Sequence, residues 1–482
     1  MTTIPCPVRR SVERNPEAAA VLESGKTLTY TQYDRRISAA ARQLQKLGIQ
    51  PGTRVAVYAQ ASTAVLILLP ALFRLKAVAC LLNLREPVPA LASRIKMTGC
   101  KILFAPSSEL ETLKDLPGTR FPTEYLLTGD PDDEPAGGDP VVDFDQEATV
   151  IFTSGSTSEP KAILHSYGNH YDNALGSNEL IPVTAGDRWL LSLPLYHVSG
   201  IGIMFRCFLG GGTVVVPQDK EDQADAISRY EITHASFVPT QLQRLLDRPN
   251  GPQTLKLLKA ILLGGAPIPP GLTAAARRHS LKNVYCTYGL SEMASQVATG
   301  PITTDGNFCA RILLHRDAKI SPEGEILVNG KTLFLGYLSE NKIHRPLTPD
   351  GWFATGDLGK ISSEGGLTVT GRKDNMFISG GENISPEEIE LALGRLNGVR
   401  RALVVAVEDR DLGQRPVAFL DTAPGAAVTE THILRELRNA LSGYKIPRTY
   451  YLWPAEATQG LKVSKKLFRQ MAETGTGLTR LQ

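Results

Sequence analysis

Cysteine and net charge are both scarce in this sequence of 482 residues. Its six cysteines are too widely spaced for a CxxC motif and too few for a disulfide framework in a protein of this size. The 52 Lys and Arg nearly balance the 49 Asp and Glu, which leaves a formal net charge of +3. Because a dedicated nucleic-acid binder needs a strongly positive surface, we expect small-molecule substrates and no nucleic-acid partner.

The sequence also lacks a secretory signal and a convincing membrane span. Its N-terminal residues contain no apolar segment of the kind that directs secretion. One uncharged run, Val55–Phe73, is interrupted by Gln60 and Pro70. We interpret it as a strand over residues 55–59 followed by a helix capped near Ser62. These absences predict a soluble protein of the cytoplasm with no membrane span.

The sequence does contain the alternating pattern of an α/β protein. Because 482 residues exceed what one hydrophobic core usually covers, we expect at least two domains. From about residue 26 to 330, short apolar runs alternate with longer helical stretches; the runs include 54–58, 148–152, 213–217 and 260–263, and the helical stretches include 35–47 and 241–246. This alternation predicts a large N-terminal domain, residues 1–373, of parallel-type sheets with flanking helices.

The remaining residues, 374–482, predict a separate small α+β domain. We expect its first helix to run from Pro386 to about Leu396, with Ser385 as N-cap, Pro386 at the first helical position and Glu388 completing a capping box. The further expected elements are strands at 402–407, 416–420 and 449–452 and a helix at 431–441.

A run of small residues, Thr153-Ser154-Gly155-Ser156-Thr157-Ser158, follows the strand expected at 149–152 and precedes Lys161. The amides and hydroxyls of such a loop can surround phosphate oxygens, and Lys161 adds a cation. The loop is not a Walker A motif, because Pro160 and Ala162 stand where that motif has Gly and Ser or Thr. Taken alone, the run is equally typical of a Ser/Thr-rich surface turn.

Further segments follow in a fixed order between about residues 28 and 467; they are Gly264-Gly265-Ala266, Tyr288-Gly289-Leu290-Ser291-Glu292, Thr355-Gly356-Asp357, Gly371-Arg372-Lys373-Asp374 and Gly460-Leu461-Lys462. With the Ser/Thr-rich loop, they resemble the motifs of the adenylate-forming superfamily, which includes acyl-CoA synthetases and luciferases. The resemblance implies an AMP-forming acid–thiol ligase that uses ATP, Mg²⁺ and coenzyme A. Ser158 departs from the pattern, because these loops usually carry Gly there, which implies a stiffer loop.

The resemblance implies a role for each residue of these segments. The nucleotide-binding residues are Thr153, Ser154, Gly155, Ser156 and Thr157 at the phosphates, Gly264, Gly265, Ala266, Tyr288 and Gly289 at the adenine, Ser291 at the α-phosphate, and Asp357 and Arg372 at the ribose. The catalytic residues are Lys161, Glu292, which helps to hold Mg²⁺, and Lys462, which bridges the attacking carboxylate and the α-phosphate. A helix-start carboxylate is the alternative for Glu292, and a solvated basic segment with Lys465 and Lys466 is the alternative for Lys462.

The resemblance also implies that the C-terminal domain is mobile. Asp374 matches the hinge residue of the superfamily, and Ser379, Gly380 and Gly381 are expected to line a channel for coenzyme A. A plain hairpin turn is the alternative for these three residues. Segments at Gly324-Glu325 and Gly336-Tyr337 match the superfamily as well, but we assign them no chemistry.

The segment Leu193–Arg206 bears on which acid is activated. Relatives that activate amino acids place an Asp close to this point to bind the substrate's ammonium group, and this chain has no acid there. His197 and Ser199 lie at a glycine-rich helix start that resembles the acyl pocket of aryl- and acyl-CoA ligases. Arg206 interrupts an apolar run, and its fork suits a second carboxylate on the substrate; an arginine that reaches the surface from a buried helix is the alternative.

Within the superfamily, segments 189–206, 233–241 and 371–389 look most like those of the o-succinylbenzoate–CoA ligases of menaquinone and phylloquinone biosynthesis. Their substrate is an aromatic dicarboxylic acid, of which one carboxylate is activated while the other is held, and this gives Arg206 a function. Two alternatives stay open: a ligase of the same mechanism for another acid, and an ATP-binding relative that no longer ligates. Homodimers are common in such ligases, although the sequence does not report an oligomeric state.

Overall fold

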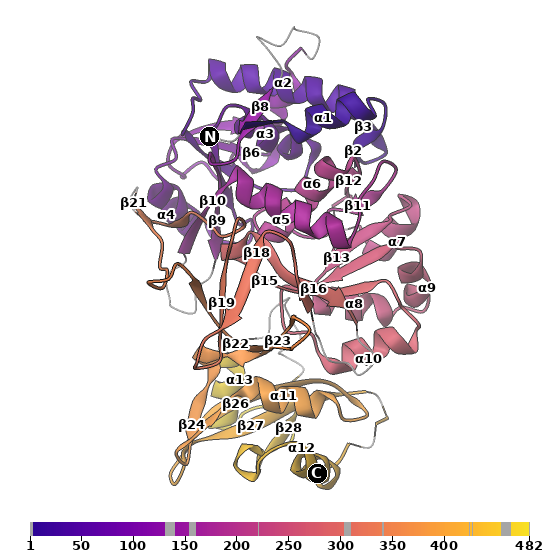
Figure 1. Cartoon of the computed structure of the whole chain (residues 1–482), viewed down its shortest axis with the longest axis vertical. Helices are drawn as coiled ribbons and strands as arrows, with labels where there is room; N and C mark the ends of the chain where they lie inside the picture. The colour runs from indigo at the N-terminus through magenta and orange to yellow at the C-terminus, as the bar shows by residue number, and fades with distance from the viewer. Residues whose placement is uncertain are drawn as a thin grey trace.

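The computed structural model describes residues 3–130, 140–153, 161–219, 221–302, 310–339, 342–423, 425–426, 428–454 and 464–481. Figure 1 shows an elongated molecule in which the chain from the N-terminus through β23 forms the large upper part and the chain from β24 onward forms the small lower part. Within the described ranges, the strands form sheets of two, eight, thirteen and five strands. The expected α/β class with a large first part and a small second part is confirmed.

The eight-stranded sheet has the order β21-β20-β10-β9-β5-β4-β6-β7. Its strands are β4 (Arg54–Tyr58), β5 (Val78–Leu82), β6 (Ile102–Ala105), β7 (Thr119–Pro122), β9 (Glu147–Thr153), β10 (Lys161–Ser166), β20 (Gly336–Ser339) and β21 (Lys342–His344). The strands from β9 to β7 are parallel, whereas β10, β20 and β21 add antiparallel strands at one edge. The predicted parallel pattern therefore describes most of this sheet but not the edge that follows β9.

The thirteen-stranded sheet has the order β18-β19-β22-β23-β17-β16-β15-β14-β13-β11-β12-β2-β3. Its strands are β2 (Ala19–Glu23), β3 (Lys26–Thr29), β11 (Arg188–Leu190), β12 (Thr213–Val216), β13 (His234–Phe237), β14 (Ala260–Leu263), β15 (Val284–Leu290), β16 (Ser295–Pro301), β17 (Ala310–Ile312), β18 (Arg316–Ile320), β19 (Glu325–Gly330), β22 (Phe353–Ile361) and β23 (Gly366–Arg372). Strands β15 to β2 are parallel, and every pairing from β16 to β18 is antiparallel. A small antiparallel pair, β1 (Thr3–Pro5) and β8 (Val141–Asp143), completes this part.

Helices fill the space between and around the two large sheets (Figure 1). They are α1 (Pro7–Arg14), α2 (Tyr30–Lys46), α3 (Thr63–Arg74), α4 (Val88–Thr98), α5 (Tyr167–Leu180), α6 (Val198–Gly210), α7 (Gln223–Arg229), α8 (Pro239–Leu246), α9 (Gly251–Lys256) and α10 (Pro270–Arg278). Helices α2, α3, α5 and α6 share one buried apolar cluster with strands of both sheets. This shared core holds the two sheets in one body.

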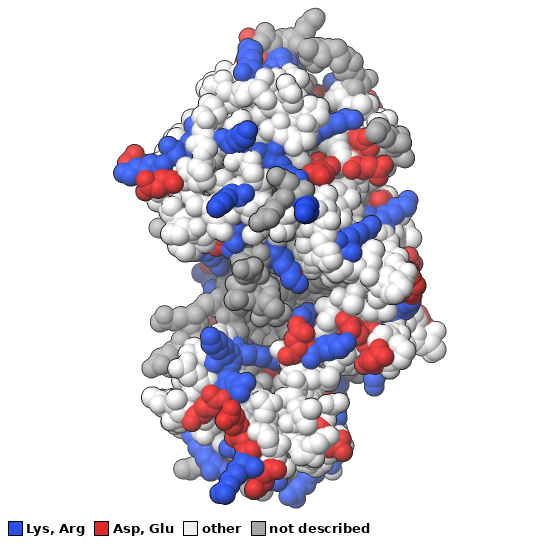
Figure 2. All heavy atoms as spheres, turned by 90° about the vertical axis from the view of Figure 1, so that its left-hand side faces the viewer, with Lys and Arg blue, Asp and Glu red and all other residues white. Residues whose placement is uncertain are grey.

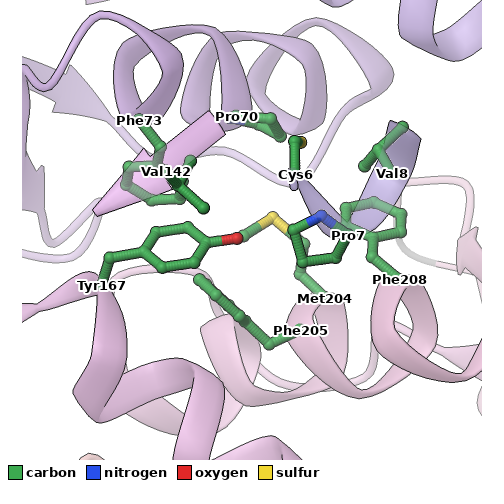
Figure 3. A pocket seen from close by; sticks show the side chains of 10 residues that line it. All are labelled: Cys6, Pro7, Val8, Pro70, Phe73, Val142, Tyr167, Met204, Phe205 and Phe208. Carbon is green, nitrogen blue, oxygen red and sulfur yellow. The ribbon is translucent and has the colours of Figure 1, made fainter. Parts of the chain in front are cut away.

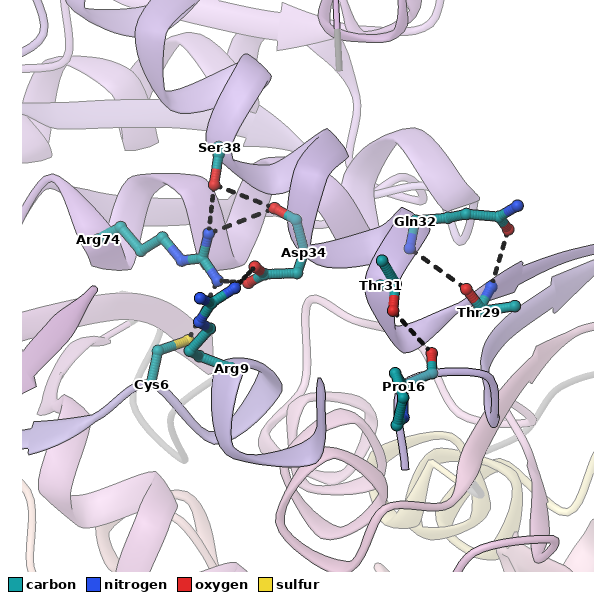
Figure 4. A network of polar contacts seen from close by, with 9 residues as sticks. All are labelled: Cys6, Arg9, Pro16, Thr29, Thr31, Gln32, Asp34, Ser38 and Arg74. Atoms are coloured by element: carbon teal, nitrogen blue, oxygen red, sulfur yellow. Dashed lines mark hydrogen bonds and ion pairs between the residues drawn. The ribbon is translucent and has the colours of Figure 1, made fainter. Parts of the chain in front are cut away.

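Helix α2 begins five residues before the predicted residue 35, because its first turn is capped. The Thr29 hydroxyl accepts from the backbone N–H of Gln32 at 3.3 Å, and the Gln32 side chain accepts from the Thr29 N–H at 3.0 Å (Figure 4). Further along the helix, buried Arg74 donates to Asp34 and to the Ser38 hydroxyl, which ties α3 to α2 (Figure 4). Arg9 of α1 joins the same carboxylate at 3.2 Å.

Helix α3 confirms the interpretation of the uncharged run at 55–73. Ser62 caps it by accepting from the Val65 N–H at 3.3 Å. Pro70 lies inside the helix, where it cannot donate to the carbonyl of Leu66, and the Tyr33 hydroxyl of α2 donates to that carbonyl instead. Among the described residues, no helix combines the length and apolar composition that crossing a bilayer requires.

The strands from residue 377 onward form the five-stranded sheet, which packs with three helices. These elements are β24 (Phe377–Ser379), β25 (Glu382–Ile384), α11 (Pro386–Gly394), β26 (Val399–Asp409), β27 (Gly413–Thr422), α12 (Glu430–Ala440), β28 (Tyr450–Leu452) and α13 (Lys465–Thr474). An ion pair between Arg400 of β26 and Asp247 at the C-terminal end of α8, at 3.2 Å, joins the small C-terminal part to the large part. On the face shown in Figure 2, Lys and Arg side chains are interspersed with Asp and Glu, as the balanced composition predicts.

The predicted capping box at the start of α11 is wrong, although Ser385 and Pro386 do occupy the N-cap and the first helical position. The Ser385 hydroxyl donates to the Glu387 carboxylate at 3.1 Å rather than accepting from the helix backbone. Glu388 binds the ammonium of Lys445 at 2.7 Å. A charged partner is a stronger attraction for a carboxylate than a neutral N–H, so it draws Glu388 away from the cap.

Two buried histidines lie where β10 meets α5. The His165 Nε2–H donates to the carbonyl of Ser291 at 2.7 Å, which requires that tautomer because a carbonyl only accepts. His170 Nε2 lies 2.7 Å from the Thr149 hydroxyl. Burial lowers the pKa of His165 to about 4, against the opposing effect of its bond to Ser291. Burial, and then the charge of His165, lower the pKa of His170 as well.

We predict that His165 makes the fold sensitive to acid. In the unfolded chain a histidine protonates below about pH 6.5, whereas folded His165 stays neutral until about pH 4. Its contribution is therefore complete above pH 6.5 and falls as the pH is lowered, by about 2 kcal/mol at pH 5. The His165→Gln variant keeps a donor for Ser291 and does not titrate. Urea unfolding at pH 7.5 and pH 5 should show a larger loss of stability in the wild type than in this variant; equal losses would contradict the prediction.

Candidate active site

Three residues predicted at the ribose and adenine meet at the junction of β15, β22 and β23. Asp357 is only 8% exposed, and its carboxylate accepts from the Tyr288 hydroxyl at 2.7 Å and from Arg372 Nη1 at 2.8 Å. Asp357 and Arg372 are direct cross-strand partners in the β22–β23 hairpin, which explains their separation of 15 residues. Burial, and then the carboxylate of Asp357, raise the pKa of Tyr288, so its hydroxyl remains a donor at neutral pH.

Arg372 also connects this carboxylate to the predicted hinge. Its Nη2 donates to exposed Asp374 at 3.0 Å, so one guanidinium holds both acids. Asp374 lies in the single turn Lys373–Asn375 between β23 and β24. Glu325, for which we predicted no chemical role, stabilises the same region. Its carboxylate accepts from the Gly356 N–H and from the Lys373 ammonium, both at 2.9 Å.

The signature segment Tyr288–Glu292 passes from β15 into the single turn Ser291–Met293. Gly289 is required there, because a Cβ at this position would lie 2.0 Å from the carbonyl oxygen of Ser295. Ser291 is half-buried, and its carbonyl is held by His165. Glu292, the next residue of the turn, is half-buried as well. Close packing therefore presents the Ser291 hydroxyl and the Glu292 carboxylate from a rigid base.

Tyr337 is a site residue that the sequence did not reveal. Its hydroxyl donates to Glu292 Oε1 at 2.7 Å, and its ring lies beneath the ammonium of Lys161, 4.8 Å from the ring centroid. Burial, and then the charge of Glu292, raise the pKa of the Tyr337 hydroxyl. The Gly336-Tyr337 motif was visible in the sequence, but the pairing of β20 with β10 that brings Tyr337 to Lys161 was not.

The residues around Glu292 fit a magnesium ion that is shared with a substrate. Within the described ranges, no group of three or more Asp, Glu, His or Cys side chains is arranged to hold a metal by itself. Only Oε1 of Glu292 is engaged there, by Tyr337, and this leaves Oε2 for a ligand. One protein carboxylate completed by phosphate oxygens and water is an ordinary Mg²⁺ environment.

The glycine segment predicted at the adenine follows β14. Gly264 is buried against the neighbouring strand, and a Cβ there would lie 2.4 Å from the methyl group of Thr287. Gly265 and Ala266 are exposed beyond it, and Gly265 has a φ of +78°. The segment therefore begins beside Thr287, the residue before Tyr288 on the adjacent strand.

The three predicted acid-site residues all belong to the start or middle of α6. His197 is exposed at the N-cap, with its ring 4.7 Å from that of Tyr196, and Ser199 is half-buried in the first turn. Arg206 lies two turns further along the helix. Helix α6 approaches the preceding loop closely, because a Cβ at Gly200 would lie 2.2 Å from the carbonyl oxygen of Pro194.

Arg206 does not reach the surface, so the alternative of a surface-seeking arginine is wrong. The residue is 1% exposed, and its guanidinium donates to Gln296 Oε1 at 2.7 Å and lies over the ring of Trp189, 5.2 Å from its centroid. Its Nε has no hydrogen-bond partner, and the described residues place no carboxylate in ion-pair contact with it. Burial lowers the pKa of Arg206 to about 10, so it remains charged at neutral pH.

A separate apolar pocket lies beside the same helix (Figure 3). Helix α6 contributes Met204, Phe205 and Phe208 to it, and Tyr167 and Cys6 line it from α5 and the start of α1. The ten described residues that line the pocket include no charged side chain.

The C-terminal candidates lie in the five-stranded sheet and beside it. Ser379 is buried at the end of β24, and Gly380 and Gly381 form the exposed hairpin turn to β25, with φ values of +58° and +89°. The hairpin alternative thus describes their local structure. Lys465 at the start of α13 is paired with Glu387 at 2.9 Å and with Glu390 at 3.4 Å, so it does not belong to a solvated basic segment.

Several predicted residues lie outside the described part of the chain. These are Ser154, Gly155, Ser156, Thr157 and Ser158 of the phosphate loop, and Lys462. The two ends of the loop are described: Thr153 closes β9 and is the cross-strand partner of Lys161, which opens β10. The loop therefore connects two antiparallel strands and begins beside Lys161, Tyr337 and Glu292.

The chain is similar to known proteins over most of its length. The family model of AMP-binding enzymes matches residues 8–338, and the model of the AMP-binding enzyme C-terminal domain matches residues 388–459. A 2-succinylbenzoate–CoA ligase of Geobacillus sp. (strain WCH70) is 31% identical over 477 residues, which span 95% of this chain and 96% of that protein.

Two solved structures of o-succinylbenzoate CoA synthetase from Bacillus subtilis superpose on the chain with a TM-score of 0.79 and 28% identity. One is a complex with the acyl-adenylate intermediate OSB-AMP, and the other is a complex with ATP and magnesium ion. Each alignment covers 94% of this chain, and 95% and 96% of the respective structures. These matches span both parts of the fold, and the chain belongs to the AMP-binding enzyme family.

Proposed function

We propose that the chain is a 2-succinylbenzoate–CoA ligase, which converts the acid, ATP and coenzyme A into the thioester, AMP and pyrophosphate. The observation that carries the substrate class is Arg206, a buried cation with no carboxylate partner among the described residues. An acid with two carboxylates can have one activated while the other pairs with this guanidinium. The relatives of matching length carry the same activity in their names.

In the first step of the proposed reaction, a carboxylate oxygen of the succinyl group attacks the α-phosphorus of ATP. A P–O bond to the acyl group forms while the bond to pyrophosphate breaks. Lys462 bridges the two reacting groups, and Lys161 with the loop from Thr153 to Thr157 holds the phosphates. Glu292 would hold Mg²⁺, which when bound offsets phosphate charge. Catalysis of this kind depends on positioning and charge stabilisation.

The nucleotide is held between the adenine surface and Asp357. Gly264, Gly265, Ala266, Tyr288 and Gly289 surround the base. Asp357 accepts the ribose hydroxyls, for which two adjacent carboxylate oxygens are suited acceptors, and Arg372 keeps that carboxylate in place. Ser291 faces the α-phosphate from the turn that His165 supports.

In the second step, the thiol of coenzyme A attacks the carbonyl carbon of the acyl-adenylate. A C–S bond forms and the C–O bond to AMP breaks. Residues 374–482 act as a domain that turns about Asp374 between the two steps, and the segment at Ser379, Gly380 and Gly381 lines the path of the pantetheine. The link from Asp357 through Arg372 to Asp374 supports a hinge that responds to the nucleotide. Closure keeps water from the adenylate.

The proposal is tested by incubating the purified chain with ATP, Mg²⁺, coenzyme A and a panel of aromatic and aliphatic acids. We expect the 2-succinylbenzoyl thioester with an equal amount of AMP, detected by mass spectrometry. A thioester of a different acid alone would retain the mechanism and refute the substrate. No thioester and no pyrophosphate with any acid would refute ligase activity.

Substitution of Arg206 should affect acids with a second carboxylate selectively. In Arg206→Leu we expect KM for 2-succinylbenzoate to rise about 100-fold, because a charge-assisted pair is lost, and KM for benzoate to change little. Arg206→Lys keeps the charge but loses the bidentate fork. Its KM for 2-succinylbenzoate should therefore lie between that of the wild type and that of Arg206→Leu. Equal effects of Arg206→Leu on both acids would assign the residue a structural role.

Removal of the Tyr337 hydroxyl should weaken the response to Mg²⁺. Tyr337→Phe leaves the ring under Lys161 but frees Glu292, so we expect the Mg²⁺ concentration for half-maximal rate to rise about fivefold. The stabilisation of the chain by Mg²⁺ and ATP in thermal unfolding should shift to higher Mg²⁺ in parallel. Tyr337→Leu, which also removes the ring, should in addition raise KM for ATP. An unchanged Mg²⁺ response in Tyr337→Phe would contradict this role.

A further inference from the structure

Gln296 of β16 is the hydrogen-bond partner of the Arg206 guanidinium. The residue is 1% exposed, and its Oε1 accepts from Arg206 Nη2 at 2.7 Å. The orientation of the amide is determined, because an arginine only donates and must therefore face the oxygen. The amide nitrogen then donates to the Thr299 hydroxyl at 2.8 Å.

The contact is rigid because it continues into the neighbouring strand. The Thr299 hydroxyl donates to the Thr287 hydroxyl at 2.9 Å, and Thr287 packs directly on Gly264. The backbone carbonyl of Gln296 accepts from Arg316 Nε at 2.6 Å and from Asn173 at 3.1 Å. Gln296 is thus held at both its backbone and its side chain, and it cannot easily move away from Arg206.

The other described neighbours of the Arg206 guanidinium include no carboxylate in ion-pair contact with it. A Cβ at Gly202, one turn earlier in α6, would lie 3.1 Å from Arg206 Nη2, so the absence of a side chain leaves room beside the fork. Trp189 covers one face of the guanidinium. Burial, and then the charge of Arg206, lower the pKa of Arg316 to about 9, against the opposing effect of the Asp172 carboxylate. Arg206 itself has no ion-paired carboxylate among the described residues.

Such an arrangement is costly for the unliganded fold, since buried charges are ordinarily paired. A glutamate at 296 would have almost the same shape as glutamine and would neutralise Arg206 at once. The rotatable Thr299 hydroxyl could turn to donate to that glutamate, so hydrogen bonding does not require the amide. Stability alone would favour an acid at this position, and the neutral residue therefore points to a requirement of ligand binding.

We propose that Gln296 is a specificity-determining residue, which orients Arg206 through a neutral amide and so leaves the guanidinium charge for the free carboxylate of the acid. This inference rests on the proposed function. Gln296 acts through Arg206, so it is a positioning residue and need not touch the reacting atoms. The neutral partner makes the site selective for acids that bring their own second negative charge.

The test compares Gln296→Glu with Gln296→Met in the full chain. Glutamate should occupy Arg206 and compete with the substrate, so KM for 2-succinylbenzoate should rise about 30-fold, with KM for ATP and for benzoate changed less than about twofold. Methionine removes the hydrogen bond but leaves the Arg206 charge available to the substrate, so KM for 2-succinylbenzoate should rise no more than about fivefold. The affinities for 2-succinylbenzoate measured by calorimetry should follow the same order, with the wild type binding most tightly, Gln296→Met next and Gln296→Glu most weakly.

Thermal unfolding separates this role from a merely structural one. Because glutamate supplies the missing counterion, Gln296→Glu should unfold at the same or a higher temperature than the wild type, although it binds the acid less well. A Gln296→Glu chain that fails to fold or melts earlier would overturn the inference, as would an unchanged KM for the acid or a methionine variant impaired as strongly as the glutamate one. A wild type that forms no 2-succinylbenzoyl thioester would instead refute the proposed function.

Discussion

The acid site depends on one unbalanced interaction, the burial of the Arg206 guanidinium against a neutral amide. Taking an arginine out of water costs several kcal/mol that a carboxylate partner would ordinarily offset, and the described chain supplies no such partner. The surrounding structure tolerates this because α6 is held in the core between the two large sheets and because Gln296 is anchored to β15 and to Arg316. In the proposed reaction, a ligand with a free carboxylate would complete the site, so that recognition of the acid would also relieve the unpaired charge.

The residues proposed to bind the nucleotide are brought together by the antiparallel strands that flank the parallel centres of both sheets. The β22–β23 hairpin places Asp357 opposite Arg372, and the edge pairing of β10 with β20 places Tyr337 beside Lys161 and Glu292. Each pairing joins groups that carry opposite charge or complementary hydrogen-bonding capacity, 15 residues apart in the hairpin and far apart in the sequence where β10 meets β20. Arg372 extends the first cluster to Asp374, so the Asp357 carboxylate and the turn that leads into the C-terminal sheet share one guanidinium.

Local sequence patterns predicted individual helices and strands well. They predicted the ends of helices and the antiparallel edges of the sheets less well. The strand at 54–58 and the Ser62-capped helix that follows it were visible in the sequence because burial and capping leave local signatures. Helix α2 begins earlier than its apolar pattern predicts, because the Thr29–Gln32 capping box starts it at Tyr30. The capping box predicted at Ser385 does not form, because Lys445, distant in sequence, attracts Glu388. Antiparallel edges such as β10 with β20 were not predicted, since nothing local to either strand specifies its neighbour.

The sequence by itself determined the α/β class, the order of the motifs and the identity of the residues that carry charge or hydroxyl groups, because each of these is a property of short segments. It also singled out Arg206 as an anomaly in an apolar run. Only the tertiary structure decided that Arg206 is buried, that its partner is the neutral Gln296 some ninety residues away, and that Tyr337 supports Glu292. Burial and pairing arise from contacts between segments distant in sequence, and the energy of a charge depends on those contacts rather than on its neighbours in the chain.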